Sequence, residues 1–411
     1  MKAVGIIAEY NPFHKGHAYH LRAARETTGA DAAAVVMSGN YTQRGEPAAF
    51  DKWQRTRWAL EAGADLVIEL PTAYAVSSAE GFALGAVTLL HRLGAVDFFC
   101  FGSETDDLAL LERIAGLLAE EPPEFRRHLK RLLSEGHTHA RARAIAATLL
   151  LDDPSAEKAL VSPNAILAVE YLKARRAIGS PLRPVAVRRL SAGYCEGGLD
   201  HEMPSATAIR AGVFARGVDD ERITAALPPH VHKSMAGAVR GGFRPVCMDD
   251  FSKMLLYSLR RLGKDGIANL GEVAEGLENR IYEACFRART AGELVDRVNT
   301  KRYTRTRLQR ILVYALLGID KATLCSLRFP ETPVYARILG FTRTGEALLK
   351  KISKACNIDL VPKAAAYDPG DAVLEKLFAI DVLGTDLYAT AQHEPSWRAW
   401  GQDFTRPVIK L

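Results

Sequence analysis

The chain has 411 residues, of which 48% are hydrophobic and 25% charged, and its formal net charge is +6. That length exceeds a usual single core, so two or more domains are expected, and the composition is that of a soluble globular protein. No apolar run reaches membrane-spanning length, and Glu9 interrupts the first apolar run too soon for a signal peptide, so a cytoplasmic protein without membrane contact is expected.

Strand and helix signals alternate through the first hundred residues. Strands are predicted at 4–7, 32–37, 64–69 and 96–101, with helices at about 17–28, 51–62 and 79–93 between them. This alternation predicts an α/β fold with a doubly wound parallel sheet. Such sheets bind ligands outside the carboxyl ends of their strands, so the polar turns at 11–14, 38–40 and 102–104 are expected to converge.

The rest of the chain divides at about residue 240. Helical signals at about 106–177 predict an insertion, strand character returns at 184–190, and helical periodicity recurs at 251–261, 274–289, 305–317 and 346–354. We therefore expect an α/β domain at 1–240 with a helical insertion, and a mostly α-helical domain at 241–411. Six scattered cysteines without a C-x-x-C pair fit a reducing compartment better than a disulfide framework or a zinc site, so no metal-binding residues are predicted.

An H-x-G-H pattern, formed by His14, Gly16 and His17, follows the first predicted strand. The strand ends in a turn at 11–12, and an alanine-rich helix begins near His17. A helix N-terminus after a tight turn is an anion site, and two imidazoles there can donate hydrogen bonds to phosphate oxygens. Chance gives such a pattern with odds of only about 0.02. The pattern therefore predicts that the chain handles a nucleoside triphosphate.

A second element, S-x-T-x-x-R, begins a predicted helix with Ser205, Thr207 and Arg210. Ser205 alone fits simple helix capping equally well. The three side chains together offer two hydroxyls and a guanidinium to a phosphate chain.

A basic segment at 280–310 carries nine basic residues against three acidic ones. A surplus of that size predicts a phosphate-backbone footprint. A helix is expected from Arg305 onward with its arginines projecting outward, and Tyr303 either stacks on a base or anchors the core. The expected contacts with RNA are Lys301, Arg302, Tyr303, Arg305, Arg307 and Arg310.

The two motifs together resemble the nucleotidyltransferases that attack the α-phosphate of ATP and release pyrophosphate. Further segments narrow the resemblance through nearly the whole chain: Y-T-Q-R-G-E-P-A at 41–48, G-A-D-L-V-I-E-L-P at 63–71, F-G-S-E at 101–104, P-N at 163–164 and K-R-Y-T at 301–304. In this order they resemble the tRNA(Met) cytidine acetate ligase family. The resemblance implies that acetate is adenylated with ATP and the acetyl group is passed to the wobble cytidine of elongator tRNA(Met), forming N(4)-acetylcytidine.

The resemblance also implies which residues do this. ATP is the substrate, Mg²⁺ is expected with it, acetate and elongator tRNA(Met) are the partners, and no protein partner is evident. His14, Lys15, His17 and Arg210 are the expected catalytic residues. The expected ATP-binding residues are Ile7, Ala8, Glu9, Asn11, Pro12, Phe13, His14, Gly16, His17, His20, Gly102, Asn164, Arg188, Arg189, Ser205 and Thr207.

Neighbouring strand residues point to opposite faces, so only one of Arg188 and Arg189 is expected to reach ATP. Capping is the more common role for Asn164. Lys52 is expected to be a solvated helix charge unless it faces the cleft. The chain departs from the family at Cys195, where the family usually has a histidine in G-x-Y-H-D, and the loop through His201 is longer.

Two other functions remain open from the residues. A small-molecule adenylyltransferase has no need of the basic helical segment, and a non-catalytic tRNA-binding protein has no need of both intact motifs. A class I aminoacyl-tRNA synthetase is disfavoured because the chain has no K-M-S-K-S motif.

Overall fold

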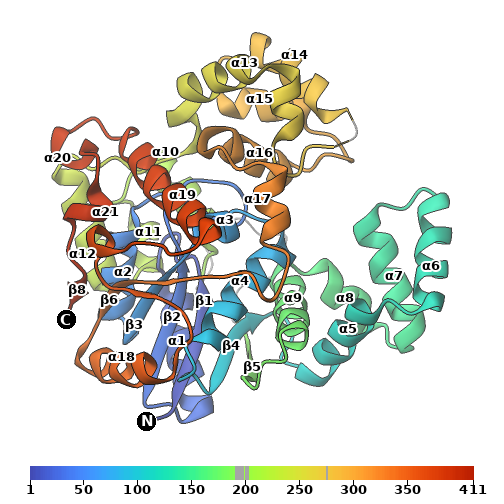
Figure 1. The fold of residues 1–411 in the computed structure, drawn as a ribbon, viewed down its shortest axis with the longest axis horizontal. Coiled ribbons are helices and arrows are strands. Elements are labelled where there is room, and N and C mark those ends of the chain that lie inside the picture. The colour runs from blue at the N-terminus through green and yellow to red at the C-terminus, as the bar shows by residue number, and fades with distance from the viewer. Residues whose placement is uncertain (190–198, 200–202, 275) are drawn as a thin grey trace.

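The computed structural model describes residues 1–189, 199, 203–274 and 276–411, and its centre is a mostly parallel sheet (Figure 1). The strands run in the order β5-β4-β1-β2-β3-β6-β7, with β8 paired to β6. The first five are parallel: β1 (Ala3–Ala8), β2 (Ala32–Ser38), β3 (Leu66–Leu70), β4 (Phe98–Ser103) and β5 (Arg183–Arg188). The predicted doubly wound α/β sheet is confirmed.

Both faces of the sheet are covered, which explains why the central strands β1 and β2 are apolar along nearly their whole length. In β2, Ala34 and Val36 pack into one hydrophobic cluster, and Val35 and Met37 pack into another on the opposite face. The helices that follow the first strands are α1 (Lys15–Thr28), α2 (Lys52–Glu61), α3 (Thr72–Ala75) and α4 (Ala79–Arg92). The crossover helices leave the carboxyl ends of the strands open to loops, and the site lies there.

A group of helices between β4 and β5 projects to one side in Figure 1, within the stretch expected as an insertion. They are α5 (Leu108–Glu120), α6 (Pro123–Ser134), α7 (His139–Leu151), α8 (Ser155–Val161) and α9 (Pro163–Ala177). The helices after β5 are α10 (Ala206–Arg216), α11 (Glu221–Ala226), α12 (Pro229–Arg240), α13 (Ser252–Asn269), α14 (Leu277–Arg287), α15 (Ala291–Val298), α16 (Arg305–Leu317) and α17 (Lys321–Ser326).

The last eighty or so residues return to the sheet, which the expectation of a mostly helical segment at 241–411 did not include. β6 (Ala336–Phe341) pairs antiparallel with β3, and β7 (Leu360–Val361) and β8 (Ile409–Lys410) pair with β6. β6 is a short run without alternation that is apolar except for Arg337, and such a run does not distinguish a strand from a helix. The helices here are α18 (Arg343–Ala355), α19 (Ala372–Ala389), α20 (Pro395–Arg398) and α21 (Gln402–Thr405).

A buried ionic cluster fastens this returning segment to the first half of the chain. Lys52 is fully buried, with its Nζ 2.8 Å from Glu69 Oε1 and 2.8 Å from Asp403 Oδ1. Arg337 in β6 also lies 2.9 Å from Asp403. Burial alone would raise the pKa of Asp403, but Lys52 and Arg337 hold it below its usual value. The expectation that Lys52 is a solvated charge is therefore wrong, because its partners come from β3 and from the chain end.

No helix in the described residues is long and apolar enough to cross a bilayer.

Candidate nucleotide site

The H-x-G-H pattern forms the first turn of α1, directly after the loop that follows β1. His14 is the N-cap, and its Nδ1 accepts a hydrogen bond of 3.0 Å from the Gly16 N–H. The His14 N–H lies 3.3 Å from Nδ1 of His17, and the two rings stack with centroids 3.8 Å apart. A Cβ on Gly16 would lie only 2.8 Å from the His14 ring. Glycine is therefore needed here to make room for the imidazole.

Burial keeps these imidazoles neutral. Burial, reinforced by the positive charge of Arg189, lowers the pKa of His14 from 6.5 to about 3. Burial likewise lowers the pKa of His20 to about 4 and that of His17 well below its usual value. Because Nδ1 of His14 accepts a hydrogen bond, its single proton lies on Nε2. That Nε2 is buried and has no hydrogen-bond partner among the described residues. His14 therefore presents a donor that lacks an acceptor.

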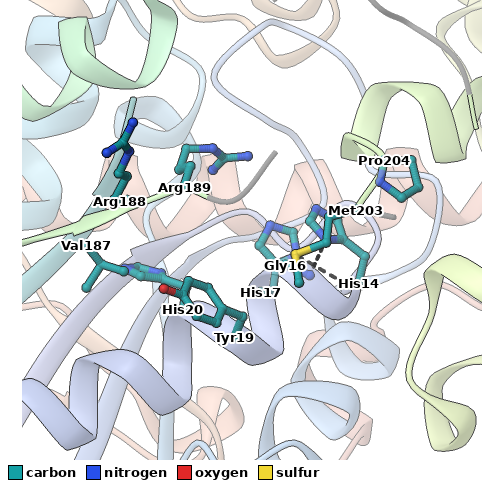
Figure 2. A pocket seen from close by; sticks show the side chains of 11 residues that line it. His14, Gly16, His17, Tyr19, His20, Val187, Arg188, Arg189, Met203 and Pro204 are labelled. Carbon is teal, nitrogen blue, oxygen red and sulfur yellow. Dashed lines mark hydrogen bonds between the residues drawn. The ribbon is translucent and has the colours of Figure 1, made fainter. Parts of the chain in front are cut away.

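A pocket of about 460 Å³ opens beside these rings at the carboxyl end of the sheet (Figure 2). Its walls come from the start of α1, the end of β4, the end of β5 and the residues before α10. The residues that line it are His14, Gly16, His17, Tyr19, His20, Gly102, Val187, Arg188, Arg189, Met203 and Pro204. Seven of these, all but Tyr19, Val187, Met203 and Pro204, are among the expected ATP-binding residues.

Arg188 and Arg189 diverge at the end of β5, as strand alternation requires (Figure 2). Arg188 is exposed, whereas Arg189 is partly buried and lies over Gly102, where a Cβ would approach its side chain to 3.3 Å. The Arg189 Nε is buried without a hydrogen-bond partner among the described residues, and burial lowers the pKa of its guanidinium. A buried, incompletely satisfied cation beside a donor imidazole is the environment that an anionic group completes.

The S-x-T-x-x-R element begins α10 and is joined to the first turn through Arg210. Ser205 is the N-cap, and its Oγ accepts from the Ala208 N–H at 3.2 Å. Arg210 Nη1 donates to the Asn11 carbonyl at 2.8 Å, and Nη2 lies 3.2 Å from a Glu46 carboxylate oxygen. Thr207 Oγ1 lies 3.4 Å from the same nitrogen. Among the described residues, Ser205, Thr207 and Arg210 do not line the pocket, and Ser205 and Thr207 are exposed where α10 begins.

Most other expected nucleotide contacts also support the turn. The Asn11 side chain accepts from the Ala49 N–H at 2.9 Å, and Phe13 is buried between the rings of Tyr10 and His17. Pro12 is buried as well, and Ile7 and Ala8 are half-buried where β1 ends. The Glu9 carboxylate accepts from the Gln43 N–H at 2.7 Å, and burial raises its pKa despite that bond and the nearby arginines. Lys15 is exposed and lies outside the described pocket lining.

Asn164 is occupied by a different contact. Its Nδ2 donates to Glu104 Oε1 at 2.7 Å, and the other Glu104 oxygen accepts from the Ala165 N–H at 2.8 Å. Glu104 therefore caps α9, and the turn after β4 is tied to the helical insertion.

Sequence reasoning gave Glu46 no role, although the residue lies within a quoted family segment. Its carboxylate accepts from Arg210 and, at 2.9 Å, from Gln309 Nε2 in α16. No local spacing connects residues that are 263 positions apart. Cys195 and His201, where the chain departs from the family, lie outside the described residues.

The basic segment is only partly a free surface. Arg310 is buried and pairs with Glu272, with nitrogen–oxygen distances of 2.8 and 2.6 Å. Burial would lower the pKa of Arg310, but Glu272 raises it above its usual value. Arg307 donates to the Glu272 carbonyl at 2.6 Å, and Tyr303 is buried and anchors the core. The expected helix from Arg305 is confirmed as α16, but outward projection is wrong for Arg310, because α16 is buried on nearly every side.

Two other expected contacts in this segment, Lys301 and Arg302, are exposed just before α16, and Arg305 forms an exposed ion pair with Asp296.

The comparisons with known proteins agree with this geometry. A family model described as HIGH Nucleotidyl Transferase matches residues 1–403. The tRNA(Met) cytidine acetate ligase of Thermoanaerobacter pseudethanolicus is 41% identical, and that of Acetivibrio thermocellus is 40% identical, each over the full length of both chains. Two crystal structures of Thermotoga maritima TmcAL match this chain at 32% identity over 100% of both chains. The TM-score is 0.94 for the structure without ligand and 0.92 for the structure bound with alpha-thio ATP. The chain belongs to the HIGH nucleotidyl transferases and, among them, to the tRNA(Met) cytidine acetate ligase family.

Proposed function

We propose that this chain is a cytoplasmic ligase that uses ATP to activate acetate and then acetylates the wobble cytidine of elongator tRNA(Met). Family membership over the whole chain supports the reaction. The single structural observation that carries it is the buried Nε2–H of His14, which has no acceptor among the described residues and borders the pocket. A phosphate oxygen of ATP supplies that acceptor.

In the first step, an acetate oxygen attacks the α-phosphorus. The new oxygen–phosphorus bond forms as the bond to the bridging oxygen breaks, and pyrophosphate leaves with the electron pair. Such a step requires positioning and charge stabilisation more than covalent help from the protein. His14 donates to the phosphates as a neutral imidazole, His17 lines the pocket beside it, and Arg189 stabilises the negative charge.

Mg²⁺ enters this proposal with the triphosphate. No group of three or more His, Cys, Asp or Glu side chains among the described residues is arranged to hold a metal ion. Mg²⁺ commonly binds through substrate phosphates and water with few protein ligands. In this proposal the ion would be held mainly by the phosphates of ATP. When bound, the ion would neutralise charge on the departing pyrophosphate.

In the second step, the exocyclic amine of cytidine attacks the carbonyl carbon of acetyl adenylate. The carbon–nitrogen bond forms, the bond to the phosphate oxygen breaks, AMP leaves with the electron pair, and the amine loses one proton. The target base must be unstacked from its loop for this attack. We assign Lys301, Arg302 and Arg305 to phosphate contacts with the tRNA, and Arg210 to positioning the Asn11 carbonyl rather than touching the substrate.

Two measurements test the proposal. Labelled pyrophosphate should exchange into ATP only when acetate is present, and nucleosides from tRNA incubated with protein, ATP and acetate should contain N(4)-acetylcytidine by mass spectrometry. Exchange driven by nicotinate mononucleotide and not by acetate would instead establish a small-molecule adenylyltransferase.

A further inference from the structure

An exposed surface on α13 and α14 combines aromatic rings with cations, and neither motif involves it. Tyr257 in α13 is 68% exposed and Phe286 in α14 is 56% exposed. Neighbouring apolar side chains exposed within a polar rim mark interaction sites, whereas single exposed ones are ordinary. Figure 1 shows both helices at the outer end of the helical layer, beyond α16.

The rings and cations pair across the two helices. The Arg260 guanidinium lies 5.4 Å from the centre of the Phe286 ring, and Lys264 Nζ lies 5.8 Å from the Tyr282 ring. The Tyr282 and Phe286 rings are themselves 5.1 Å apart, edge to face. Tyr257 precedes Arg260 by three residues and therefore lies on the same side of α13. These five residues form one stripe of alternating rings and charges, the α13–α14 stripe.

The arginine in the stripe is fixed in place. Arg260 Nη2 donates to the Cys285 carbonyl at 2.7 Å, which holds the guanidinium beside the Phe286 ring. A guanidinium fixed in this way loses little further conformational freedom when a ligand binds beside it. Arg260 and the neighbouring Phe286 ring are thus in contact before any partner arrives.

The surroundings of the stripe are strongly basic. Asp265 and Glu283 are the exposed acidic residues of α13 and α14, and Glu278 is half-buried. Against them stand the exposed basic residues Lys253, Arg260, Arg261, Lys264, Arg280, Arg287 and, just after α14, Arg289. Rings among cations suit unpaired nucleotides, because each base stacks on a ring while its phosphate contacts a cation.

We infer that the α13–α14 stripe binds the unpaired bases of an RNA loop by stacking. The inference rests on the proposed function in one respect, namely that the RNA is the tRNA acetylated at the pocket. It shifts base recognition away from the segment at 301–310, where Tyr303 is buried and Arg310 is committed to Glu272.

Binding of two synthetic RNAs tests the inference, an anticodon stem-loop of elongator tRNA(Met) and a fully paired duplex of the same length. Tyr257→Leu and Phe286→Leu should each weaken stem-loop binding by about fivefold or more. Tyr257→Phe keeps the ring and should bind as the unmodified protein does. Phe329→Leu is the matched control, because Phe329 is 62% exposed but lies after α17, away from the stripe.

Charge and base contacts are separable in the same assay. Arg261→Gln and Lys264→Gln should weaken the binding of both RNAs. Each should also lower the slope of log affinity against log salt concentration by about one unit. Tyr257→Leu and Phe286→Leu should bind the duplex with the affinity of the unmodified protein. Wild-type affinity for the stem-loop in both leucine variants would overturn the inference, as would equal losses for stem-loop and duplex. A dimer seen by light scattering that Phe286→Leu abolishes, with RNA binding intact, would also overturn it and assign the surface to self-association.

Failure of the proposed function is detected separately. Acetate-dependent exchange and N(4)-acetylcytidine formation are measured on the unmodified protein, so their absence contradicts the ligase activity without affecting the stacking result. If both activities are present and the leucine variants bind the stem-loop normally, only the stripe is refuted.

Discussion

The two roles of His14 can be separated by a single substitution, His14→Asn. The Nδ1 of His14 caps α1, and the Nε2 carries the donor that faces the pocket. Asparagine is among the best N-cap residues because its side-chain oxygen accepts from the same backbone N–H groups. It does not extend far enough to replace Nε2. The variant should therefore keep the cap and lose the donor.

The expected magnitudes differ for the two roles. Loss of an N-cap costs about 1 kcal/mol of stability, whereas loss of one preorganised transition-state donor lowers kcat by about 10²- to 10³-fold. His14→Asn should thus unfold in urea within a few tenths of a kcal/mol of the unmodified protein, with kcat for acetate-dependent exchange reduced by that factor. His14→Ala should show the same loss of kcat and an added loss of about 1 kcal/mol in stability.

Exchange kinetics at saturating ATP and urea unfolding of both variants decide the matter. If His14→Asn retains wild-type kcat, His14 acts only as a cap, and the unsatisfied Nε2 has no catalytic meaning. If both variants are equally destabilised, the capping geometry is not what holds the turn.

Three further changes follow from the described contacts. The folded-state pKa of His14, about 3, lies below its unfolded value of 6.5, so the unfolded chain binds more protons between these values and stability falls as pH drops below 6.5. Lowering the pH from 8 to 5 should reduce the free energy of unfolding by about 2 kcal/mol through His14 alone. The free energy of unfolding of His14→Asn, measured in urea, should therefore fall by about 2 kcal/mol less than that of the unmodified protein, and equal losses would contradict the low pKa. Lys52→Met leaves Glu69 and Asp403 buried with only Arg337 and should cost about 3–5 kcal/mol in urea unfolding. The control Lys350→Met, which breaks an exposed pair with Glu346, should leave the free energy of unfolding nearly unchanged, and a comparable cost for both variants would refute the buried cluster. Glu46→Gln removes the charge that holds Arg210 and should lower kcat for exchange about tenfold, whereas Gln309→Ala, which leaves that ion pair intact, should change it much less; equal effects would argue against positioning through Arg210.

Local patterns predicted the features that local physics determines. The β-α alternation predicted the parallel strands of the first hundred residues, and the H-x-G-H pattern placed two imidazoles at a helix N-terminus, where the structure has them. The position of the pocket followed from topology, because parallel strands bring the ends of β1, β4 and β5 to one edge.

Long-range partners decided what the sequence left open. The sequence pattern predicts surface charges at Lys52 and Arg310. The fold instead buries them and brings Asp403 to Lys52 and Glu272 to Arg310. β6 gives no periodic signal because it is buried along its length. Conversely, α13 and α14 have ordinary amphipathic patterns, and only the fold shows that Arg260 and Lys264 of α13 lie beside the Phe286 and Tyr282 rings of α14.

The contacts around Glu46 join the pocket to the helical layer. Gly45, at φ 75°, packs so closely against α16 that a Cβ there would lie 2.2 Å from the Arg310 backbone nitrogen, so only glycine fits between this loop and the helix. Glu46 then links Gln309 in α16 to Arg210, and Arg210 holds the Asn11 carbonyl next to the first turn of α1. Since α13 packs on α16, an RNA loop on the α13–α14 stripe and a nucleotide beside His14 are held by one continuous set of contacts. Acetyl transfer to a chosen base depends on a fixed position of the stripe relative to the pocket. The two steps use different ligands, the nucleotide and the RNA, and both must meet at one pocket.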